Sequence, residues 1–469
     1  MTPSSFSALG LSTPLLQAVK DQGYTHPTPI QLQTIPAVLA GKDVMAAAQT
    51  GTGKTAAFAL PLLQRLTGSK AGTNHIRALI LTPTRELAIQ VAESFAAYGR
   101  HLPLKSGVVY GGVKINPQMM QLRGGLDVLV ATPGRLLDLF SQNAVQFSQV
   151  ETLILDEADR MLDLGFSDDL GKIMALLPKK RQSLLFSATF SDEIKRLTGQ
   201  LLHQPVRIEV SPPNSAATGV KQWVYEIDSA KKAALLSHLL RNRAEGQVLV
   251  FTRTKKGADR LVGQLKREQI SAAAIHGDKS QTERTRTLAD FKAARIRVLI
   301  ATDIAARGID IHDLPRVINF DLPKVAEDYI HRIGRTGRAG AEGEAISLVS
   351  ADEVPLLTAI ETLLRRLLPR ETVAGFVPKH NVPLTTLQKA KPKKPKKPKK
   401  TTVPAQPQAE PPPNRHRKPR WTGNKEEDTP KTRGKQGRGR GAVAGPKGAG
   451  PKGAAPRPNR TTPKKKNRG

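Results

Sequence analysis

Two short segments of this chain carry residue types suited to phosphate chemistry. The first is AQTGTGKT at residues 48–55, a Gly-rich loop whose backbone N–H groups can surround phosphate oxygens. In such a loop Lys54 reaches the β- and γ-phosphates, and the Thr55 hydroxyl ligates Mg²⁺. The second is LILDEAD at residues 153–159, which predicts a buried strand that delivers Asp156 and Glu157 to its carboxyl end. Together the two segments predict binding and hydrolysis of a nucleoside triphosphate.

Each segment also has a simpler interpretation. The general phosphate-loop pattern opens with Gly where this chain has Ala48, so strict agreement runs only from Gly53 through Thr55. The loop alone could be a Gly-rich turn without a ligand, and the acids could be a solvated charge run. A solvated run would not follow three consecutive branched apolar residues, so nucleotide binding is favoured. The residues expected to contact the nucleotide in this loop are Ala48, Gln49, Thr50, Gly51, Thr52, Gly53, Lys54 and Thr55.

Composition narrows the class of protein. The chain has 469 residues, too many for one core, so two or three structural units are expected. It contains no Cys, which excludes disulfides and thiolate metal sites and suits a reducing compartment. The first residues lack the basic and apolar regions of a secretory signal, and no apolar run has the length of a membrane span. We therefore expect a cytoplasmic protein with no membrane partner.

The positive charge is concentrated at one end of the chain. Residues 389–469 contain 26 Lys and Arg but 4 acids, so +22 of the total net charge of +33 lies there. Pro, Gly and like charges leave too little apolar surface to offset chain entropy, so this tail is expected to be disordered. A flexible polycation commonly binds nucleic acid by counterion release. A merely solubilising tail is the alternative.

The body alternates apolar runs with helical patterns, which predicts βαβ units and an α/β fold with parallel sheets. The expected strands are 78–82, 127–132, 152–156 and 183–188, and then 247–252, 272–277, 297–302 and 316–320. The segment SPPNSAATG at 211–219 breaks every period and predicts a linker. We therefore expect domains at 1–210 and 220–368 and a basic tail at 369–469. Because only the first domain has a phosphate loop, we expect the second domain to supply the residues that complete the first domain's nucleotide site.

The segment HRIGRTGR at 331–338 contains candidate residues that could complete the nucleotide site of the first domain. Arg335 and Arg338 could act as arginine fingers, whose guanidinium groups neutralise charge that develops on a transferred phosphoryl group. The alternative is a basic patch that faces RNA. The Gly spacing and the absence of a second phosphate loop favour fingers.

With these motifs in order, the chain resembles the DEAD-box RNA helicases, and within them the bacterial RhlE group. The resemblance covers about residues 6–368 and implies two tandem RecA-like parallel-sheet domains, with ATP and Mg²⁺ as ligands. The segment GYTHPTPIQ at 23–31 resembles the family's Q motif, with Phe6 as its isolated upstream aromatic residue. This implies that Phe6 stacks on adenine and that Gln31 hydrogen-bonds the edge of the base.

The resemblance also implies RNA contacts in both domains. PTREL at 83–87, the Gly pair at 111–112 and TPGR at 132–135 resemble those of the first domain, and FTRT at 251–254, HG at 276–277 and Thr302 resemble those of the second. Such residue types suit phosphate and 2′-hydroxyl contacts rather than base reading, although most could also serve as strand-end caps and turns. The RNA-binding residues expected are Thr84, Arg85, Gly112, Thr132, Arg135, Arg253, Gly277 and Thr302.

Three further motifs resemble family segments with other roles. SAT at 187–189 resembles the segment that links hydrolysis to strand opening, which implies coupling roles for Ser187 and Thr189. TDIAARGID at 302–310 implies that Gly308 and Asp310 reach the ribose, and QTER at 281–284 fits a motif that braces the second domain.

The resemblance predicts an ATP-dependent RNA helicase of limited reach. In this mechanism Thr55 and Asp156 position Mg²⁺, partly through water, Glu157 orients the attacking water, and Arg335 and Arg338 act once the domains close. By analogy with the family, precursor-ribosome and RNA-decay complexes are the expected partners. Two alternatives stay open: an ATP-gated RNA clamp that separates no duplex, and a DNA translocase, which the adenine-reading segment and the sugar contacts disfavour.

Overall fold

Two parallel β-sheets organise the chain. The computed structural model describes residues 5–48, 51–188, 191–210, 220–242, 246–306, 309, 311, 314–337, 343–380 and 382–387. The predicted linker at 211–219 and the basic segment from residue 388 onward lie outside these described residues.

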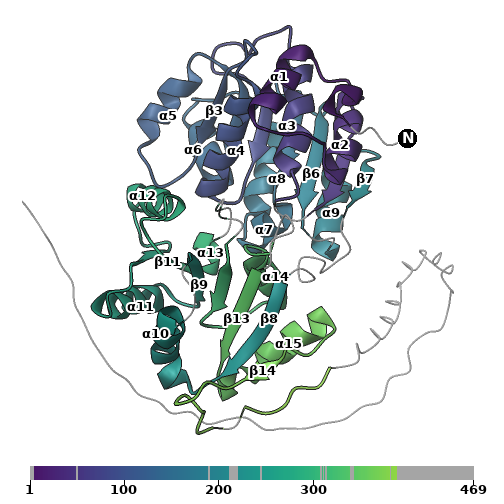
Figure 1. Cartoon of the computed structure of the whole chain (residues 1–469). Helices are drawn as coiled ribbons and strands as arrows, with labels where there is room; N and C mark the ends of the chain where they lie inside the picture. The colour runs from purple at the N-terminus through teal and green to yellow at the C-terminus, as the bar shows by residue number, and fades with distance from the viewer. Residues whose placement is uncertain are drawn as a thin grey trace, which may run out of the picture. The chain divides into compact units, whose positions relative to one another are not determined.

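The first sheet has seven strands in the order β3-β4-β2-β5-β6-β1-β7. Figure 1 labels its two edge strands, β3 and β7, on opposite sides of the domain. All of its strand pairs are parallel. Its strands are β1 (Val44–Ala47), β2 (Ile76–Leu81), β3 (Ser106–Val109), β4 (Leu126–Ala131), β5 (Thr152–Leu155), β6 (Gln182–Ser187) and β7 (Val206–Glu209).

Buried apolar residues cover both faces of this sheet. In β2, Ala78 and Ile80 pack into one core cluster, and Leu79 and Leu81 pack into another. This alternation puts successive side chains on opposite faces, and both faces are covered, as expected for a parallel sheet. The helices of this domain are η1 (Phe6–Leu9), α1 (Thr13–Asp21), α2 (Pro29–Leu39), α3 (Lys54–Arg65), α4 (Arg85–Tyr98), α5 (Ile115–Leu122), α6 (Pro133–Ser141), α7 (Ala158–Asp163), α8 (Ser167–Leu176) and α9 (Asp192–Leu201).

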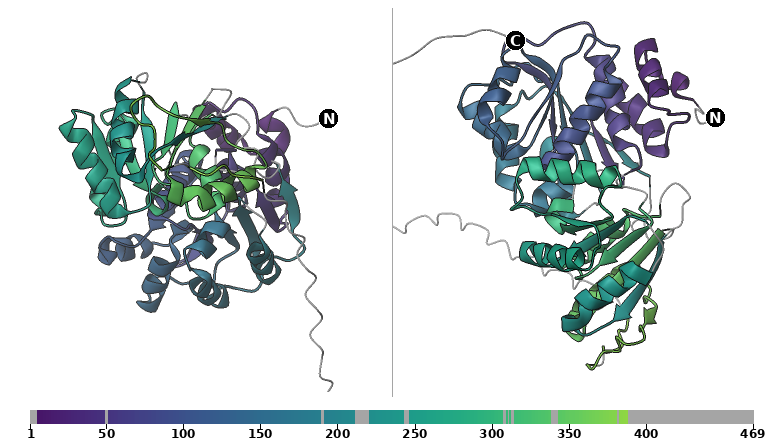
Figure 2. Two further views of the ribbon diagram at one scale, coloured as in Figure 1. Left: turned by 90° about the horizontal axis from the view of Figure 1, so that it is seen from below. Right: turned by 60° about the vertical axis from the view of Figure 1, so that its left-hand side comes forward.

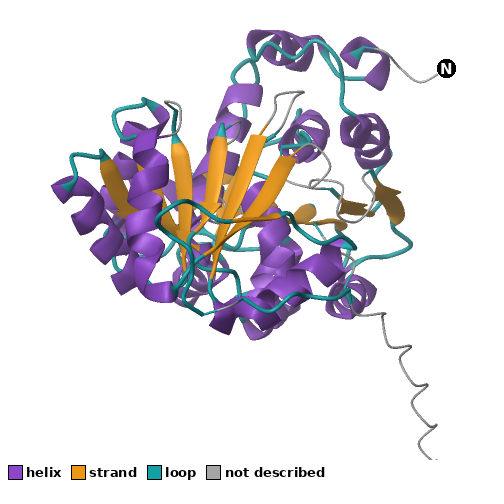
Figure 3. Ribbon diagram, turned by 60° about the horizontal axis from the view of Figure 1, so that its bottom comes forward, coloured by secondary structure: helices purple, strands orange, loops and turns teal. Residues whose placement is uncertain are grey.

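The second sheet also has seven strands, in the order β10-β11-β9-β12-β13-β8-β14. Its pairs are likewise parallel. Its strands are β8 (Val220–Glu226), β9 (Val248–Thr252), β10 (Ala272–Ile275), β11 (Val298–Thr302), β12 (Arg316–Asn319), β13 (Gly343–Val349) and β14 (Arg370–Glu371). Figure 3 shows strands as orange arrows with purple helices on both sides.

The helices of the second domain follow the same alternation of strand and helix (Figure 2). They are η3 (Ser229–Lys231), α10 (Lys232–Asn242), α11 (Lys255–Arg267), α12 (Gln281–Lys292), α13 (Asp303–Ala306), α14 (Ala326–Ile333), η4 (Ala351–Glu353) and α15 (Val354–Leu364). Core clusters again lie on both faces of the sheet, with Val250 in one and Leu249 in the other. The predicted fold class, two tandem α/β domains with parallel sheets, is confirmed.

The second domain continues past residue 368, where the sequence placed the start of the tail. Strand β14 pairs with β8, and Arg370 in β14 forms an ion pair with Glu226 at 2.9 Å and donates to Thr385 Oγ1 at 2.9 Å. Val382 and Thr385 are buried. The fold therefore extends at least to Thr385. A strand of two residues is too short to give a periodic signal in the sequence.

Among the described helices, none has both the length and the apolar character needed to cross a lipid bilayer.

Candidate nucleotide and RNA site

The phosphate loop joins β1 to α3, and its shape requires glycine. Gly51 and Gly53 have φ of 81° and 89°, in the left-handed region that L-residues with a Cβ avoid. A Cβ on Gly53 would lie 2.5 Å from Gln31 Nε2. Helix α3 begins at Lys54 with no side-chain cap, so its first N–H groups remain available to an anion. Gln49 and Thr50 lie outside the described residues.

Lys54 and Asp156 are buried in a way that fits a bound phosphate and cation. Lys54 Nζ and Asp156 Oδ1 are both buried and have no hydrogen-bond partner among the described atoms. Burial raises the pKa of Asp156 to about 6, although the Lys54 charge acts in the opposite direction. Anionic phosphates would give the ammonium its acceptors, and Mg²⁺ would stabilise the ionised carboxylate. Mg²⁺ is commonly held by one or two protein groups together with substrate phosphates, which matches Thr55 and Asp156.

Glu157 has an unusual backbone conformation. Its φ is 53°, it is buried, and it is the N-cap of α7. A non-Gly residue in this region costs of order 1–3 kcal/mol, and such strain is concentrated at functional sites. The neighbouring Asp159 accepts hydrogen bonds from the backbone N–H groups of Arg160 and Ala188, each at 3.0 Å. The acidic segment is therefore bonded to the end of β6, directly after the buried Ser187, whereas Thr189 lies outside the described residues.

One pocket of about 480 Å³ brings most of the predicted catalytic residues together. It is lined by Gln22, Tyr24, Gly51, Gly53, Lys54, Thr55, Ala56, Leu87, Gln90, Glu93, Ser94, Ala97, Tyr98, Asp156, Glu157, Ile309 and Arg335. Arg335 comes from the second sheet's domain, and its Nη1 donates to the Ile309 carbonyl at 2.6 Å. Gly308, Asp310 and Arg338 lie outside the described residues, so their predicted roles stay predictions.

The two residues expected to contact adenine, Phe6 and Gln31, contact other residues of the chain in this structure. Phe6 is buried in the core and stacks on Tyr24, with ring centroids 6.5 Å apart. Gln31 Oε1 accepts from Thr28 N at 2.9 Å, and its Nε2 donates to the Gly53 carbonyl at 3.2 Å. Neither residue is among those that line the pocket, so adenine contact stays a prediction for both. Tyr24, which is 40% exposed and lines the pocket beside Gln22, was not predicted from the sequence as a site residue.

The RNA contacts expected in the first domain lie after the carboxyl ends of β2, β3 and β4. Thr84 and Thr132 are the N-caps of α4 and α6. Gly112 has φ of 80°, and a Cβ there would lie 2.1 Å from Arg85 Nη1, so glycine permits the close approach of this guanidinium. Arg135 Nη2 donates to the Val113 carbonyl at 2.9 Å, while its buried Nε and Nη1 make no hydrogen bond with the described atoms. Two helix N-termini and two arginines thus lie at the carboxyl end of the first sheet.

The corresponding residues of the second domain follow β9, β10 and β11. Arg253 Nη2 donates to Glu353 Oε1 at 3.0 Å, and Thr302 ends β11 as a buried residue. Gly277 faces Lys255, whose Nζ would lie 3.5 Å from an added Cβ. All three residues lie at the carboxyl end of the sheet, where ligands of open α/β sheets bind.

Buried side chains connect the two domains. Glu86 accepts from Gln281 Nε2 at 3.0 Å and pairs with Arg284 Nη2 at 2.8 Å. Arg160 of α7 pairs with Asp328 of α14 at 2.7 Å. The QTER segment therefore bonds to the first domain as well as belonging to the second. Sequence reasoning missed Glu86, Arg160 and Asp328, because only the fold brings these partners together.

The fold and the pocket define a two-domain phosphate-loop protein in which an arginine of the second domain reaches the first domain's site. Models of protein families agree. The DEAD/DEAH box helicase model matches residues 28–197, and the helicase conserved C-terminal domain model matches residues 231–340.

Individual proteins with similar sequences belong to the same family. The DEAD-box ATP-dependent RNA helicase RhpA of Helicobacter pylori is 45% identical over 347 residues, which is 74% of this chain and 70% of RhpA. The DEAD-box ATP-dependent RNA helicase CshA of Bacillus cereus is 42% identical over 367 residues, which is 78% of this chain and 69% of CshA. The solved structure of Saccharomyces cerevisiae Dbp5 bound to RNA and ADP BeF3 is 34% identical, with a TM-score of 0.72 over 79% of this chain and 96% of that one. The chain therefore belongs to the DEAD-box ATP-dependent RNA helicases, with ATP and Mg²⁺ as its ligands and RNA as its partner. The resemblance to the RhlE group within this family stays a prediction.

Proposed function

We propose that this helicase separates short RNA duplexes locally and remodels ribonucleoprotein, and that closure of its two domains on ATP and RNA drives both activities. The observation that carries the proposal is the pocket shared by Lys54, Asp156, Glu157 and Arg335, with Arg335 coming from the second domain. The contacts of Glu86 with Gln281 and Arg284 support a closed arrangement that RNA and nucleotide together would stabilise.

The charged and hydroxyl side chains proposed to act on ATP then have distinct roles. Lys54 and the N-terminus of α3 bind the phosphates, and Thr55 and Asp156 hold Mg²⁺, which neutralises phosphate charge when bound. Glu157 orients and polarises the attacking water. Arg335, with Arg338, stabilises the charge of the transition state, and such a finger contributes roughly 10³–10⁵ in rate. Hydrolysis is therefore slow until the domains close.

RNA binds along the carboxyl ends of both sheets. The N-termini of α4 and α6 in the first domain, and of α11 in the second, carry the partial positive charge that phosphates prefer. Phosphate contacts carry no base information, so the binding is independent of sequence. When closure bends one strand, a short duplex loses pairing locally and the partner strand dissociates.

A strand-displacement assay tests this function. A short RNA duplex with a single-stranded RNA extension should be separated in the presence of ATP and Mg²⁺, and a DNA extension should abolish the activity. ATP turnover without strand release would favour the RNA clamp. Equal activity with a DNA extension would favour the DNA translocase.

A substitution at Arg335 distinguishes two roles for this residue, an arginine finger and part of an RNA-binding patch. Arg335→Ala should lower ATP turnover even at saturating RNA, because the lost interaction belongs to the transition state. Full recovery of the rate at higher RNA concentrations would make Arg335 an RNA contact instead.

For the cellular role we propose ribosome assembly or RNA turnover in the cytoplasm, with precursor-ribosome or RNA-decay complexes as partners. The support is the family's association with these processes. Crosslinking of RNA to the protein in cells, with and without residues 389–469, would identify the RNAs. Enrichment of neither ribosomal precursors nor decaying transcripts would contradict the proposal.

A further inference from the structure

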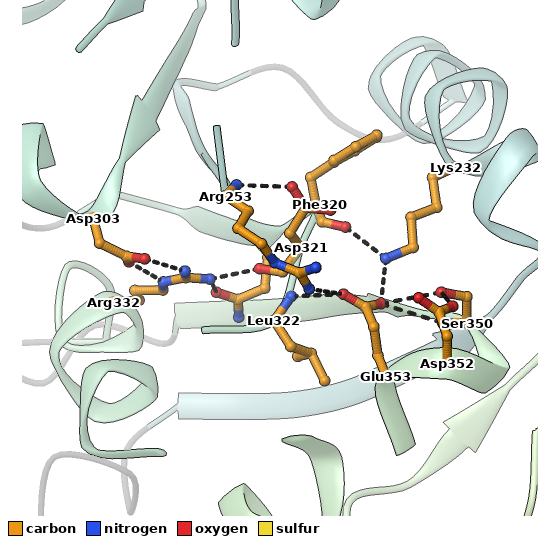
Figure 4. Close-up of polar contacts among 11 residues, drawn as sticks. Lys232, Arg253, Asp303, Phe320, Asp321, Leu322, Arg332, Ser350, Asp352 and Glu353 are labelled. Carbon is orange, nitrogen blue, oxygen red and sulfur yellow. Dashed lines mark hydrogen bonds and ion pairs between the residues drawn. The ribbon is translucent and has the colours of Figure 1, made fainter. Parts of the chain in front are cut away.

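A buried carboxylate in the second domain connects four chain segments around Arg253 (Figure 4). Glu353 Oε1 accepts from Arg253 Nη2 at 3.0 Å and from Leu322 N at 3.2 Å. Its Oε2 accepts from Lys232 Nζ and from Ser350 N, the latter at 3.3 Å. Glu353 thereby joins the end of β9, the segment after β12, the end of β13 and the start of α10.

Stability is a weak explanation for this arrangement. The side chains of Glu353 and Lys232 are each 3% exposed. Removing two charges from water is unfavourable enough that well-packed apolar pairs are often as stable as buried ion pairs. Arg253 differs from both buried residues, since its side chain is 38% exposed. The buried pair therefore holds an arginine that reaches solvent.

Arg253 is fixed at two points. Its backbone N donates to Asp321 Oδ2 at 2.8 Å, while Glu353 binds one end of its guanidinium. An arginine whose direction is already set loses less rotamer freedom when it binds a phosphate. Lys232 supplies a second cation to the same carboxylate, so Arg253 is not the sole compensating charge for Glu353.

We propose that Glu353 is a positioning residue, which holds the Arg253 guanidinium in the direction needed to bind an RNA phosphate at the carboxyl end of β9. The inference rests on the proposed assignment of Arg253 as an RNA contact. Glu353 itself touches no RNA and acts through Arg253. Lys232 binds the other oxygen of the same carboxylate and so holds it in place.

The experiment is a double-mutant cycle in the full-length chain, read by RNA-stimulated ATP hydrolysis over a range of RNA concentrations. Glu353→Gln keeps an acceptor but removes the charge that orients the arginine. Arg253→Lys keeps the positive charge but loses the guanidinium. Each variant should raise the RNA concentration for half-maximal rate about tenfold, the size expected for loss of one charge-assisted hydrogen bond, and Glu353→Gln should leave the rate at saturating RNA unchanged. The double variant should be no weaker than either single variant.

Asp352→Asn is the matched control. Asp352 is the exposed neighbour of Glu353, and Ser350 Oγ donates to it at 2.6 Å. Asp352 also lies near the charges of Arg253 and Lys232. This substitution removes one negative charge at the next position but keeps the hydrogen bond between Glu353 and Arg253, so the RNA dependence should change far less than in Glu353→Gln. Thermal unfolding and ATP hydrolysis without RNA, measured for every variant, show whether Glu353→Gln leaves the fold intact.

Three results would overturn the proposal. Additive effects of Glu353→Gln and Arg253→Lys would mean that the two residues act independently. An equal effect of Asp352→Asn would mean that general charge, not position, matters. Unchanged RNA dependence in Arg253→Lys would remove Arg253 from the RNA site. Failure of the proposed function would differ from all three, because the unsubstituted chain would then separate no RNA duplex.

Discussion

At the scale of single residues, the nucleotide pocket contains charges that folding alone does not favour. Asp156 is buried, and its pKa of about 6 lies above the ordinary value of 3.8. A raised carboxylate pKa means that the folded chain binds a proton more tightly than the unfolded chain does. Ionisation therefore lowers the stability of the ligand-free protein as the pH rises from about 4 through 6. The fold would thus be more stable without this charge, which agrees with the proposed role of Asp156 in holding Mg²⁺ beside ATP.

Asp156→Asn should stabilise the protein in the absence of nucleotide and Mg²⁺. Above pH 6 the free energy of unfolding should rise by up to about 3 kcal/mol, since two pKa units correspond to about that energy. The gain should shrink as the pH falls through 6 and vanish below about pH 4, where the carboxylate is protonated in both states. Urea unfolding across this pH range measures it. Asp168→Asn, which neutralises an exposed carboxylate, serves as the control. A pH-independent difference would exclude ionisation of Asp156 as the cause of the gain.

Glu157→Gln should separate binding from hydrolysis. Glutamine keeps the shape of the side chain and accepts the left-handed backbone about as well as glutamate, but it cannot polarise water as strongly. ATP and RNA should still bind, and hydrolysis should slow by about 10²–10⁴-fold. Single-turnover hydrolysis and the lifetime of the complex of protein, ATP and RNA are the measurements. Loss of ATP binding would assign Glu157 to binding or structure instead.

At the scale of helices and strands, the sequence predicted the elements whose signal is local. Each of the eight expected strands is present, because continuous apolar runs such as those of β2 and β9 identify strands that are buried on both faces. The expected strands did not include β1, β3, β7, β8, β13 and β14. Strand β14 has two residues and depends on pairing with β8. The sequence analysis also missed three features: the stacking of Phe6 on Tyr24, the positive φ of Glu157, and the ion pair between Arg160 and Asp328. These features depend on contacts between distant segments, which residue types and spacing do not reveal.

Helix α12 offers a test of the contact between the domains. Arg284→Ala leaves the buried Glu86 without its ion-pair partner, which should weaken domain closure. RNA-saturated ATP hydrolysis should fall about tenfold, within the usual range of coupling energies, while ATP binding without RNA should stay unchanged. Arg286→Ala on the same helix is the control, because Arg286 is 85% exposed and lies 3.7 Å from Asp290 within that helix. Equal losses in both variants would indicate a general effect of charge on RNA binding.

At the scale of the whole molecule, charge is divided between a moderately basic body and a strongly basic end. Residues 389–469 carry +22 of the net charge of +33. No residue that lines the described pocket lies beyond Arg335. We therefore expect catalysis and most of the long-range attraction for RNA to reside in different parts of the chain.

Deletion of residues 389–469 should therefore change RNA affinity but not the maximal rate of ATP hydrolysis. The described residues end at 387, so the deletion leaves all the contacts among the described residues in place. The RNA concentration for half-maximal rate should rise, because a polycation that neutralises several phosphates releases their counterions on binding. For the same reason the affinity of the full chain should fall steeply with salt, and the slope should flatten in the truncated chain. Fluorescence anisotropy with a structured RNA across a salt series measures both slopes. Identical slopes would show that these residues bind no RNA and would leave solubility or protein docking as their role.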